Sequence, residues 1–329
     1  MLNGKVVFIT GGTGSFGNCF VDQVLARYRP ERLIVYSRDE FKQFQMRSRL
    51  AKYDGVMRYV IGDVRDADRL SRAMRGADYV VHAAALKQVP ACEYNPEEAV
   101  RTNIHGAMHV IEAALDAGVK RVAALSTDKA VNPVSLYGGT KLVSDKLFIA
   151  ANAGGPGGTR FSVVRYGNVA GSRGSVIPRF RALAASGAAE LPITGLEMTR
   201  FWISLEEGVE LVLRALGSSA GGETFVAKLP SFKVTDLAEA VLPGCAKREV
   251  GLREGEKLHE VMITREDAPH TLEYQGHFVI YPRLSWWTPE RVLPGGRPVP
   301  RDFVYSSGTN ESRLTVEELR QRLRSVPEC

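Results

Sequence analysis

Four ionisable side chains between residues 128 and 141 are of types that could move protons and assist a hydride transfer. Asp128 and Lys129 are adjacent, and Tyr137 precedes Lys141 by four residues. Residues four apart lie on one face of a helix, so we expect the Lys141 ammonium to lower the pKa of the Tyr137 phenol. A phenol of this kind can take a proton from a hydroxyl group while the attached carbon gives hydride to a nicotinamide. The alternatives are a helix-surface pair beside a core tyrosine and a solvent-exposed Asp-Lys ion pair.

The elements that would position these residues alternate between strand and helix. Apolar runs at 5–10, 32–37, 57–64, 77–85, 119–127 and 159–169 are separated by stretches able to form helices. Such runs predict an α/β fold of the Rossmann type, in which a doubly wound parallel sheet is covered on both faces and ligands bind beyond the strand carboxyl ends. We expect this dinucleotide-binding domain to span residues 1–168. Residues 169–329 would form mainly a smaller α/β substrate-binding lobe, with later segments returning to the first domain.

The first strand and the following helix are joined by the sequence TGGTGSFG, with glycines at three-residue intervals. The missing Cβ atoms let such a turn tighten, admit a pyrophosphate to the backbone and allow the helix to pack on the strand. The helix N-terminus favours the anion. A plain tight turn is the alternative, but this position in a strand-helix unit favours a dinucleotide. The predicted cofactor-binding residues here are Gly11, Thr13, Gly14, Ser15, Phe16 and Gly17.

The second strand ends in YSRDE, where the adenosine ribose of a dinucleotide would lie. Arg38, with Ser37 and Lys42, can pair with a 2′-phosphate, which favours NADP. Asp39 could instead accept the 2′-hydroxyl of NAD, and Arg38 and Lys42 could be solvated charges at a helix start. Further cofactor-binding residues are expected at the next strand tips, namely Asp63, Val64, Ala83, Ala84, Ala85 and Lys87, together with Tyr137 and Lys141.

The composition limits the classes of partner. Lys and Arg number 43 against 37 Asp and Glu, a formal charge of +6 that is spread along the chain, so we expect an anionic small substrate and neither nucleic acid nor membrane as partner. The spacing of the four cysteines suggests neither C-x-x-C metal ligation nor a disulfide scaffold. No signal peptide or membrane-spanning apolar run is recognised, which predicts a soluble, cytoplasmic protein.

With these motifs in place, the sequence resembles the extended short-chain dehydrogenase/reductase superfamily of nucleotide-sugar enzymes. It resembles more closely the inverting UDP-N-acetylglucosamine 4,6-dehydratases that begin pseudaminic acid synthesis. The resemblance spans nearly the whole chain and is carried by GGTGSFG, YSRDE, GDVRD, HAAALKQVP, STDKA, YGGTK, VVRYGNV, GSRGSV, PIT, MTRFW, GEKLHE and YSSGTN. Related dehydratases that retain the C5 configuration have Thr-Asp-Glu where this chain has Thr127-Asp128-Lys129.

The resemblance implies a role for each residue. Lys129 would be the base at C5, Asp128 the acid that protonates the departing C6 hydroxyl, and Thr127 would hydrogen-bond the C4 oxygen with Tyr137. The product would be UDP-2-acetamido-2,6-dideoxy-β-L-arabino-hex-4-ulose, formed by C4 oxidation, loss of water across C5 and C6, and hydride return to C6. A lysine base needs a neutral amine, which burial and neighbouring cations such as Lys141 could favour. Relatives associate as dimers or larger rings, so a homo-oligomer, dimer or hexamer, is expected.

A UDP-sugar also brings a diphosphate that needs cations. The predicted substrate-binding residues are Lys87, Asn168, Arg173, Arg179, Arg200, Arg253 and Glu256. His105 and His109 are spaced as one helix face, but no third ligand is near in sequence, so no metal is expected. His259 and Glu260 in GEKLHE are interpreted as making structural hydrogen bonds. A retaining dehydratase or an epimerase of the same fold, and a non-catalytic nucleotide-binding regulator, remain alternative functions.

Overall fold

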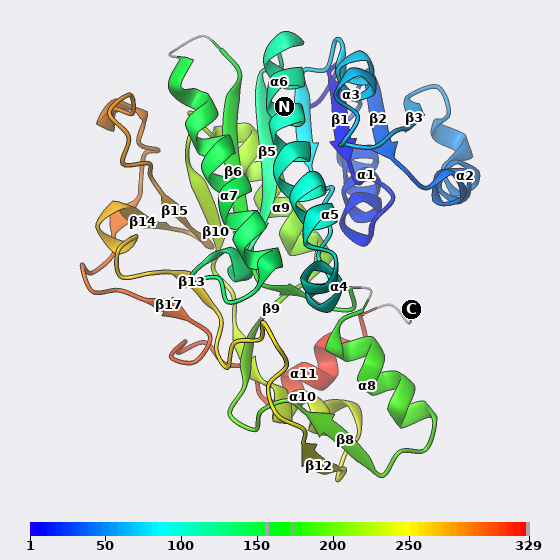
Figure 1. The fold of residues 1–329 in the computed structure, drawn as a ribbon, viewed down its shortest axis with the longest axis vertical. Helices are drawn as coiled ribbons and strands as arrows, with labels where there is room; N and C mark the ends of the chain where they lie inside the picture. The colour runs from blue at the N-terminus through cyan, green and yellow to red at the C-terminus, as the bar shows by residue number, and fades with distance from the viewer. Residues whose placement is uncertain (155–157, 173, 327–329) are drawn as a thin grey trace.

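A large β-sheet forms the centre of the upper lobe of the molecule (Figure 1). The computed structural model describes residues 1–154, 158–172 and 174–326, and within them ten strands join this sheet. In spatial order they are β16 (Arg297–Pro298), β14 (Thr271–Tyr274), β15 (His277–Ile280), β10 (Thr224–Ala227), β6 (Arg160–Tyr166), β5 (Arg121–Thr127), β4 (Tyr79–His82), β1 (Val6–Thr10), β2 (Arg32–Ser37) and β3 (Met57–Ile61).

Neighbouring strands from β10 to β3 run parallel, whereas β15, β14 and β16 pair antiparallel. The order of β3, β2, β1, β4, β5 and β6 is that of a Rossmann sheet, which reverses direction at β1 and β4 and opens a ligand crevice there. The predicted α/β fold with a parallel sheet is therefore confirmed, and each of the predicted apolar runs contains one of these strands.

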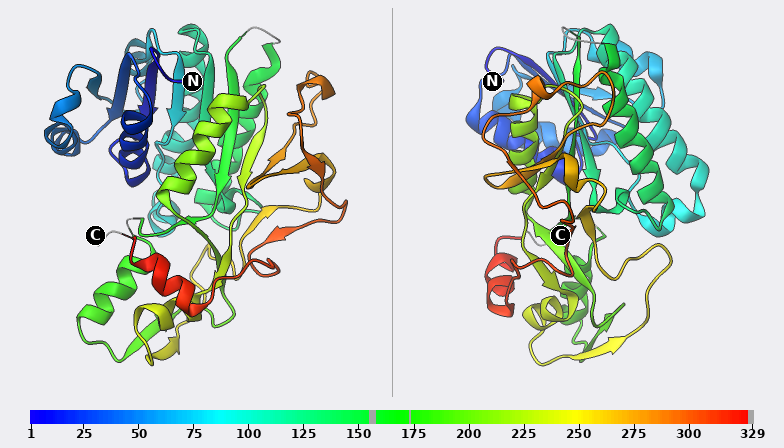
Figure 2. Two further views of the ribbon diagram at one scale, coloured as in Figure 1. Left: turned by 180° about the vertical axis from the view of Figure 1, so that it is seen from behind. Right: turned by 90° about the vertical axis from the view of Figure 1, so that its left-hand side faces the viewer.

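Helices cover both faces of the sheet, as the edge-on view of Figure 2 shows. One face carries α1 (Ser15–Arg27), α2 (Glu40–Arg49) and α9 (Leu205–Ser218). The other carries α3 (Ala67–Met74), α6 (Gly106–Asp116) and α7 (Leu136–Ala150). The short helices α4 (Val89–Tyr94) and α5 (Pro96–Val100) lead through a π-helical turn at Arg101–His105 into α6.

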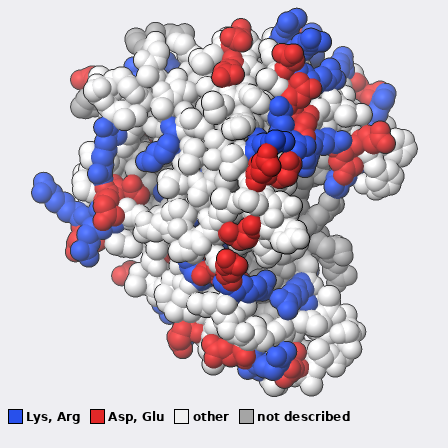
Figure 3. Space-filling view, viewed as in Figure 1, with Lys and Arg blue, Asp and Glu red and all other residues white. Residues whose placement is uncertain are grey.

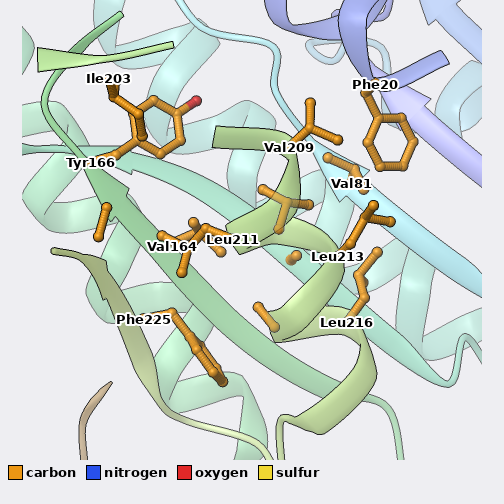
Figure 4. Close-up of a cluster of buried hydrophobic side chains, with 14 of the residues drawn as sticks. Phe20, Val81, Val164, Tyr166, Ile203, Val209, Leu211, Leu213, Leu216 and Phe225 are labelled. Carbon is orange, nitrogen blue, oxygen red and sulfur yellow. The ribbon is translucent and has the colours of Figure 1, made fainter. Parts of the chain in front are cut away.

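The later half of the chain contributes to the core of this lobe. Helix α9 begins with a capping box between Ser204 and Glu207 and inserts Val209, Leu213 and Leu216 among apolar side chains of the sheet and α1 (Figure 4). Truncating one such buried leucine to alanine costs about 2–5 kcal/mol in comparable cores. Because α9 and β10 follow residue 168, sequence order and spatial order differ here, and the predicted division at residue 168 stays a prediction.

The smaller lobe lies below the carboxyl ends of the parallel strands (Figure 1). Its strands are β7 (Asn168–Val169), β9 (Thr199–Ile203) and β11 (Ser231–Lys233) in one sheet, and β8 (Glu190–Ile193) with β12 (Ala246–Glu249) in another. Its helices are α8 (Val176–Ala185), α10 (Val234–Val241) and α11 (Val316–Leu323), which share an apolar core with β8 and β9. Strands β13 (Val261–Ile263) and β17 (Tyr305–Ser306) pair beside the junction of the lobes.

Charged side chains of both signs are interspersed on the face shown in Figure 3. Lys and Arg side chains there lie next to Asp and Glu side chains. Ion pairs occur among the described residues, such as that of Arg65 with Asp63. In the part of the chain that the structure describes, no helix is both long and apolar enough to span a membrane.

Candidate active site

A cavity of about 1000 Å³ lies at the carboxyl edge of the parallel strands. Its walls come from the turn after β1, the tips of β2, β3, β4 and β5, the start of α7, and residues 253–260 of the later half. This is the crevice in which doubly wound sheets bind ligands. Most of the site residues predicted from the sequence line it, including every predicted cofactor-binding and catalytic residue.

The glycine turn has the geometry that a bound diphosphate requires. Gly11 has φ of +65°, and a Cβ there would lie 2.8 Å from the Ala84 nitrogen. A Cβ on Gly17 would lie 2.3 Å from the Gly12 oxygen, so only glycine lets α1 pack on the turn. A Cβ on Gly14 would approach only the Gly11 oxygen, at 3.3 Å, and Gly14 faces the cavity. Since α1 begins without a side-chain cap or an acidic residue in its first turn, its N-terminus can receive an anion.

The residues at the tips of β2 and β3 are joined by ion pairs. Asp39 caps α2 by accepting from the Lys42 amide at 2.9 Å, and its carboxylate pairs with the Lys42 ammonium. These contacts hold the pKa of Asp39 below its usual value. The Arg38 guanidinium is half exposed and lies 3.5 Å from the Asp63 carboxylate, which Arg65 also contacts. Because its side chain is half exposed, Arg38 can exchange this ion pair for a contact with a ligand. The Asp39 carboxylate is engaged as the cap of α2.

A buried asparagine fixes the segment after β4 against α7. Asn103, in the π-helical turn, accepts from the Leu86 amide at 2.8 Å and donates to the Leu86 carbonyl at 2.9 Å. Its amide also donates to Thr140 Oγ1 at 3.0 Å. Because Leu86 lies between Ala85 and Lys87, these bonds set how closely the small residues of this segment approach the cavity.

The Thr127–Lys129 segment delivers a buried charge cluster to the same edge. A single turn of 3₁₀ helix, Asp128–Ala130, follows β5 directly, and Asp128 is fully buried. The Lys129 ammonium lies 3.2 Å from Asp128 Oδ1 and 2.9 Å from Glu260 Oε1. Thr127 Oγ1 donates to Asp128 Oδ1 at 3.0 Å. We refer to Asp128, Lys129 and Glu260 as the inner cluster, and it is not the exposed ion pair that the sequence left open.

The protonation of Lys129 differs from the sequence-based expectation. Burial favours the neutral amine, but the carboxylates of Asp128 and Glu260 outweigh it and raise the Lys129 pKa above its ordinary value. Burial, reinforced by the Glu260 charge, raises the pKa of Asp128. The expected neutral amine is therefore wrong for this arrangement: Lys129 is an ammonium and must lose a proton before it can act as a base.

Tyr137 and Lys141 lie one turn apart on α7, as predicted, and both are buried. Burial raises the pKa of Tyr137 to about 12, while the nearby Lys129 ammonium and a hydrogen bond with Thr127 act in the opposite direction. The expected lowering of this pKa by Lys141 is wrong, because burial dominates. Burial also lowers the pKa of Lys141, and the Asp145 carboxylate one turn further along α7 opposes that shift.

Several buried polar atoms that line the cavity have no partner within the described residues. They are Thr102 Oγ1, Asp128 Oδ2, Asn168 Oδ1, Ser175 Oγ and Glu260 Oε2. Buried polar atoms are almost always hydrogen-bonded in folded proteins, so acceptors and hydroxyls left open around one cavity indicate a polar ligand. A sugar, with its several hydroxyl groups, has the matching chemistry.

The predicted substrate-binding residues fall into three groups. Lys87, Asn168, Arg200, Arg253 and Glu256 line the cavity. Arg179 is exposed on α8 and is not among the residues that line it. Arg173 lies outside the described residues.

Sequence reasoning missed Glu260 as a member of the site. It was interpreted as a structural residue, yet its carboxylate contacts Lys129 and lies within 3.6 Å of Arg200. His259, its neighbour, does make a structural hydrogen bond, 2.8 Å from Thr199 Oγ1. The residues next to Glu260 in the sequence do not indicate this contact, because its partner Lys129 is 131 residues away. Among the residues that the structure describes, no group of three or more His, Cys, Asp and Glu could hold a metal ion.

The sequence pattern of the polysaccharide biosynthesis protein family matches residues 7–282. The chain belongs to this family. It is 52% identical over 326 residues, 97% of each chain, to the "UDP-N-acetylglucosamine 4,6-dehydratase (inverting)" of Campylobacter jejuni strain 81-176.

Two solved structures have the same fold. The X-ray structure of Pen from Bacillus thuringiensis matches with a TM-score of 0.90 and 36% identity, covering 98% of both chains. A double mutant of DesIV, a dTDP-glucose 4,6-dehydratase from Streptomyces venezuelae crystallised with NAD and DAU, matches with a TM-score of 0.68 and 25% identity. That match covers 77% of this chain and 86% of DesIV.

Proposed function

We propose that the chain is a UDP-N-acetylglucosamine 4,6-dehydratase that inverts the configuration at C5. The observation that carries this proposal is the buried Asp128–Lys129 pair beside Tyr137 in a cavity with a dinucleotide turn. The high identity to a relative with that name supports it. The first step of pseudaminic acid synthesis is the place in metabolism that such an enzyme would have.

The glycine turn and the open α1 N-terminus would hold a nicotinamide dinucleotide, which when bound would supply the hydride acceptor for C4 of the sugar and the hydride donor for C6. Tyr137, as its phenolate, takes the proton of the C4 hydroxyl, and the Thr127 hydrogen bond and the Lys129 ammonium favour that charge. The resulting C4 ketone acidifies C5. The Lys129 amine then removes the C5 proton, and Asp128 gives a proton to the C6 oxygen as water leaves.

The environment of Asp128 suits an acid. Burial raises its pKa, so this carboxyl group holds a proton more readily than an exposed aspartate does. Among the cations, Arg200 and Arg253 are the proposed contacts to the substrate diphosphate, because both line the cavity from the later half of the chain.

We further propose NADP as the dinucleotide. Asp39 lines the cavity as well, but its carboxylate caps α2 and pairs with Lys42, whereas Arg38 is half exposed at the tip of β2 and can meet a 2′-phosphate. A homo-oligomer, dimer or hexamer, is also proposed, and light scattering of the purified protein tests it.

The function is tested by incubating the protein with UDP-N-acetylglucosamine in deuterated water and following the product by NMR. A 4-keto sugar with a C6 methyl group, deuterium at C5 and inverted C5 is expected. A retaining dehydratase would give the other C5 epimer, and an epimerase would keep the C6 hydroxyl and change only C4. A nucleotide-binding regulator would leave the substrate unchanged.

A further inference from the structure

Glu260 reaches the inner cluster from the later half of the chain. It directly precedes β13, is 1% exposed, and its Oε1 lies 2.9 Å from the Lys129 ammonium. Its main chain is fixed on both sides by Ser307, which accepts from the Glu260 amide at 2.9 Å and donates its own amide to the Glu260 carbonyl at 2.8 Å. The carboxylate is therefore held in one orientation toward Lys129.

The second oxygen of this carboxylate is buried without a partner among the described residues, and Glu260 is one of the residues that line the cavity. The remaining charged groups around Lys129 and Glu260 are Asp128, Arg200, Lys257 and Lys87, with the phenol of Tyr137 close by. Of these neighbours, Asp128 is the carboxyl group within reach of the Lys129 nitrogen besides Glu260. This limits where a proton that leaves Lys129 can go.

The elimination makes two demands on the inner cluster at the same moment. Lys129 must be a neutral amine to remove the C5 proton, and Asp128 must carry a proton to give to the C6 oxygen. If Asp128 is to remain protonated as the acid, the other adjacent carboxylate must receive the ammonium proton. Building on the function proposed above, we propose that Glu260 is the proton acceptor of Lys129 and thereby a positioning residue for the elimination step.

The step balances. An N–H bond of Lys129 breaks and an O–H bond forms on Glu260 Oε1, leaving a neutral amine beside a neutral carboxyl group. The amine then takes the C5 proton, the C–H electron pair enters the enolate of the C4 ketone, and the C6–O bond breaks as Asp128 supplies the proton for water. The cluster has gained the C5 proton and lost one to water, so its proton count is unchanged.

Two effects act on the protonation of Glu260 in opposite directions. Burial favours its protonated form, whereas the charges of Lys129 and Arg200 keep its pKa below the ordinary value. The resting pair is therefore an ion pair, and moving the proton to Glu260 costs the attraction between the two charges, so the neutral pair forms only transiently, during the elimination step.

The test is Glu260→Gln in the full chain with its bound dinucleotide, because the amide keeps the shape and can accept a hydrogen bond but cannot serve as this carboxylate base. With UDP-N-acetylglucosamine, we expect C4 oxidation to persist, seen as absorbance of reduced nicotinamide at 340 nm in a single turnover. Water elimination should slow by about 100-fold, with KM changed by no more than about threefold. Glu260→Asp should recover part of the rate. Glu273→Gln, which removes an exposed carboxylate paired with Lys228, should behave as the wild type.

A second readout does not depend on turnover. The Lys129 ¹⁵Nζ signal, assigned by its loss in Lys129→Arg, should titrate at lower pH in Glu260→Gln, because one of its two carboxylates is gone. Turnover of Glu260→Gln within threefold of the wild type, an equal loss of C4 oxidation and elimination, or an unshifted lysine titration would each overturn the role of Glu260. A wild type that titrates as expected but never converts the substrate would instead refute the proposed function.

Discussion

Two clusters of acidic and basic side chains line the same cavity, and they differ in burial. In the inner cluster of Asp128, Lys129 and Glu260, the side chains of the two carboxylates are 1% exposed and that of Lys129 is 24% exposed. The rim cluster, which we define as Arg38, Asp39, Lys42 and Asp63, has side chains that are 22–54% exposed.

This difference in burial indicates which charged groups can take part in catalysis. In the rim cluster water screens each ion pair, so each pair contributes little to the free energy of folding. These charges cap the start of α2 and stay accessible to a ligand. In the inner cluster a charge without its partner is costly, and pKa values move far from their ordinary range. Four substitutions test this contrast.

The largest effect is expected for Lys129→Ala. Loss of the proposed C5 base should reduce the rate of product formation by about 1000-fold, while the dinucleotide still binds. NMR of the product and a fluorescence titration of the dinucleotide measure the two quantities. Because the variant leaves two buried carboxylates without their cation, its Tm should also fall, which Lys146→Ala on the exposed face of α7 should not reproduce. Normal turnover by Lys129→Ala would remove the inner cluster from the chemistry.

Arg38→Ser tests the rim cluster as a binding site. If Arg38 pairs with a 2′-phosphate, the Kd for NADP should rise by about tenfold or more, while that for NAD changes little. Isothermal titration with both dinucleotides measures this. An equal loss for both, or none for either, would argue against the 2′-phosphate contact and favour NAD.

His82 shows how the burial of a titratable group makes the stability of the protein depend on pH. It lies under the cavity, 2.8 Å from Thr10 Oγ1, and burial with the nearby Lys141 charge lowers its pKa to about 3. The unfolded histidine binds a proton below its ordinary pKa of 6.5 whereas the folded one does not, so stability is lost as the pH falls through that value. Between pH 7.5 and 5.5 this contribution should cost about 1.4 kcal/mol of unfolding free energy.

Urea unfolding at the two pH values measures that loss. His82→Gln should lack it, and His105→Gln, at an exposed position, should retain it. If the wild type and His82→Gln lose stability equally, His82 is not the neutral buried group described here.

The smallest effect is expected for Asp39→Ala, at the start of α2. It removes the acceptor of the Lys42 amide and should lower the unfolding free energy by about 1 kcal/mol. Asp39→Asn keeps an acceptor and should cost less, and thermal unfolding distinguishes the two. A larger loss of unfolding free energy than that caused by Lys129→Ala would mean that solvent exposure does not determine how much the charges of the two clusters contribute to stability.

The parallel strands were predictable because β-branched apolar runs repeat at regular intervals and the helices between them have room to cross over. Strands β14, β15 and β16 were not: β14 and β15 form a local hairpin of four-residue strands, but this hairpin joins the sheet through pairing of β15 with β10 and of β14 with β16, which lie elsewhere in the sequence. The glycine turn was predictable in detail because its requirement is local: Gly11 and Gly17 leave no space for a side chain.

The site was predictable where one element carries the spacing, as α7 does for Tyr137 and Lys141. The protonation of these groups was not, because a pKa depends on how completely the rest of the chain excludes water. Lys129 illustrates this: its neighbour Asp128 is visible in the sequence, but Glu260 becomes its partner only in the folded chain.

The ion pair between Lys129 and Glu260 also affects when the inner cluster can form during synthesis of the chain. As a chain leaves the ribosome, the Lys129 segment emerges 131 residues before its second carboxylate. Until then Lys129 lacks one of its two carboxylate partners. The first strands can therefore form before the inner cluster is complete. The inner cluster therefore cannot be complete before residue 260 of the 329 has been added.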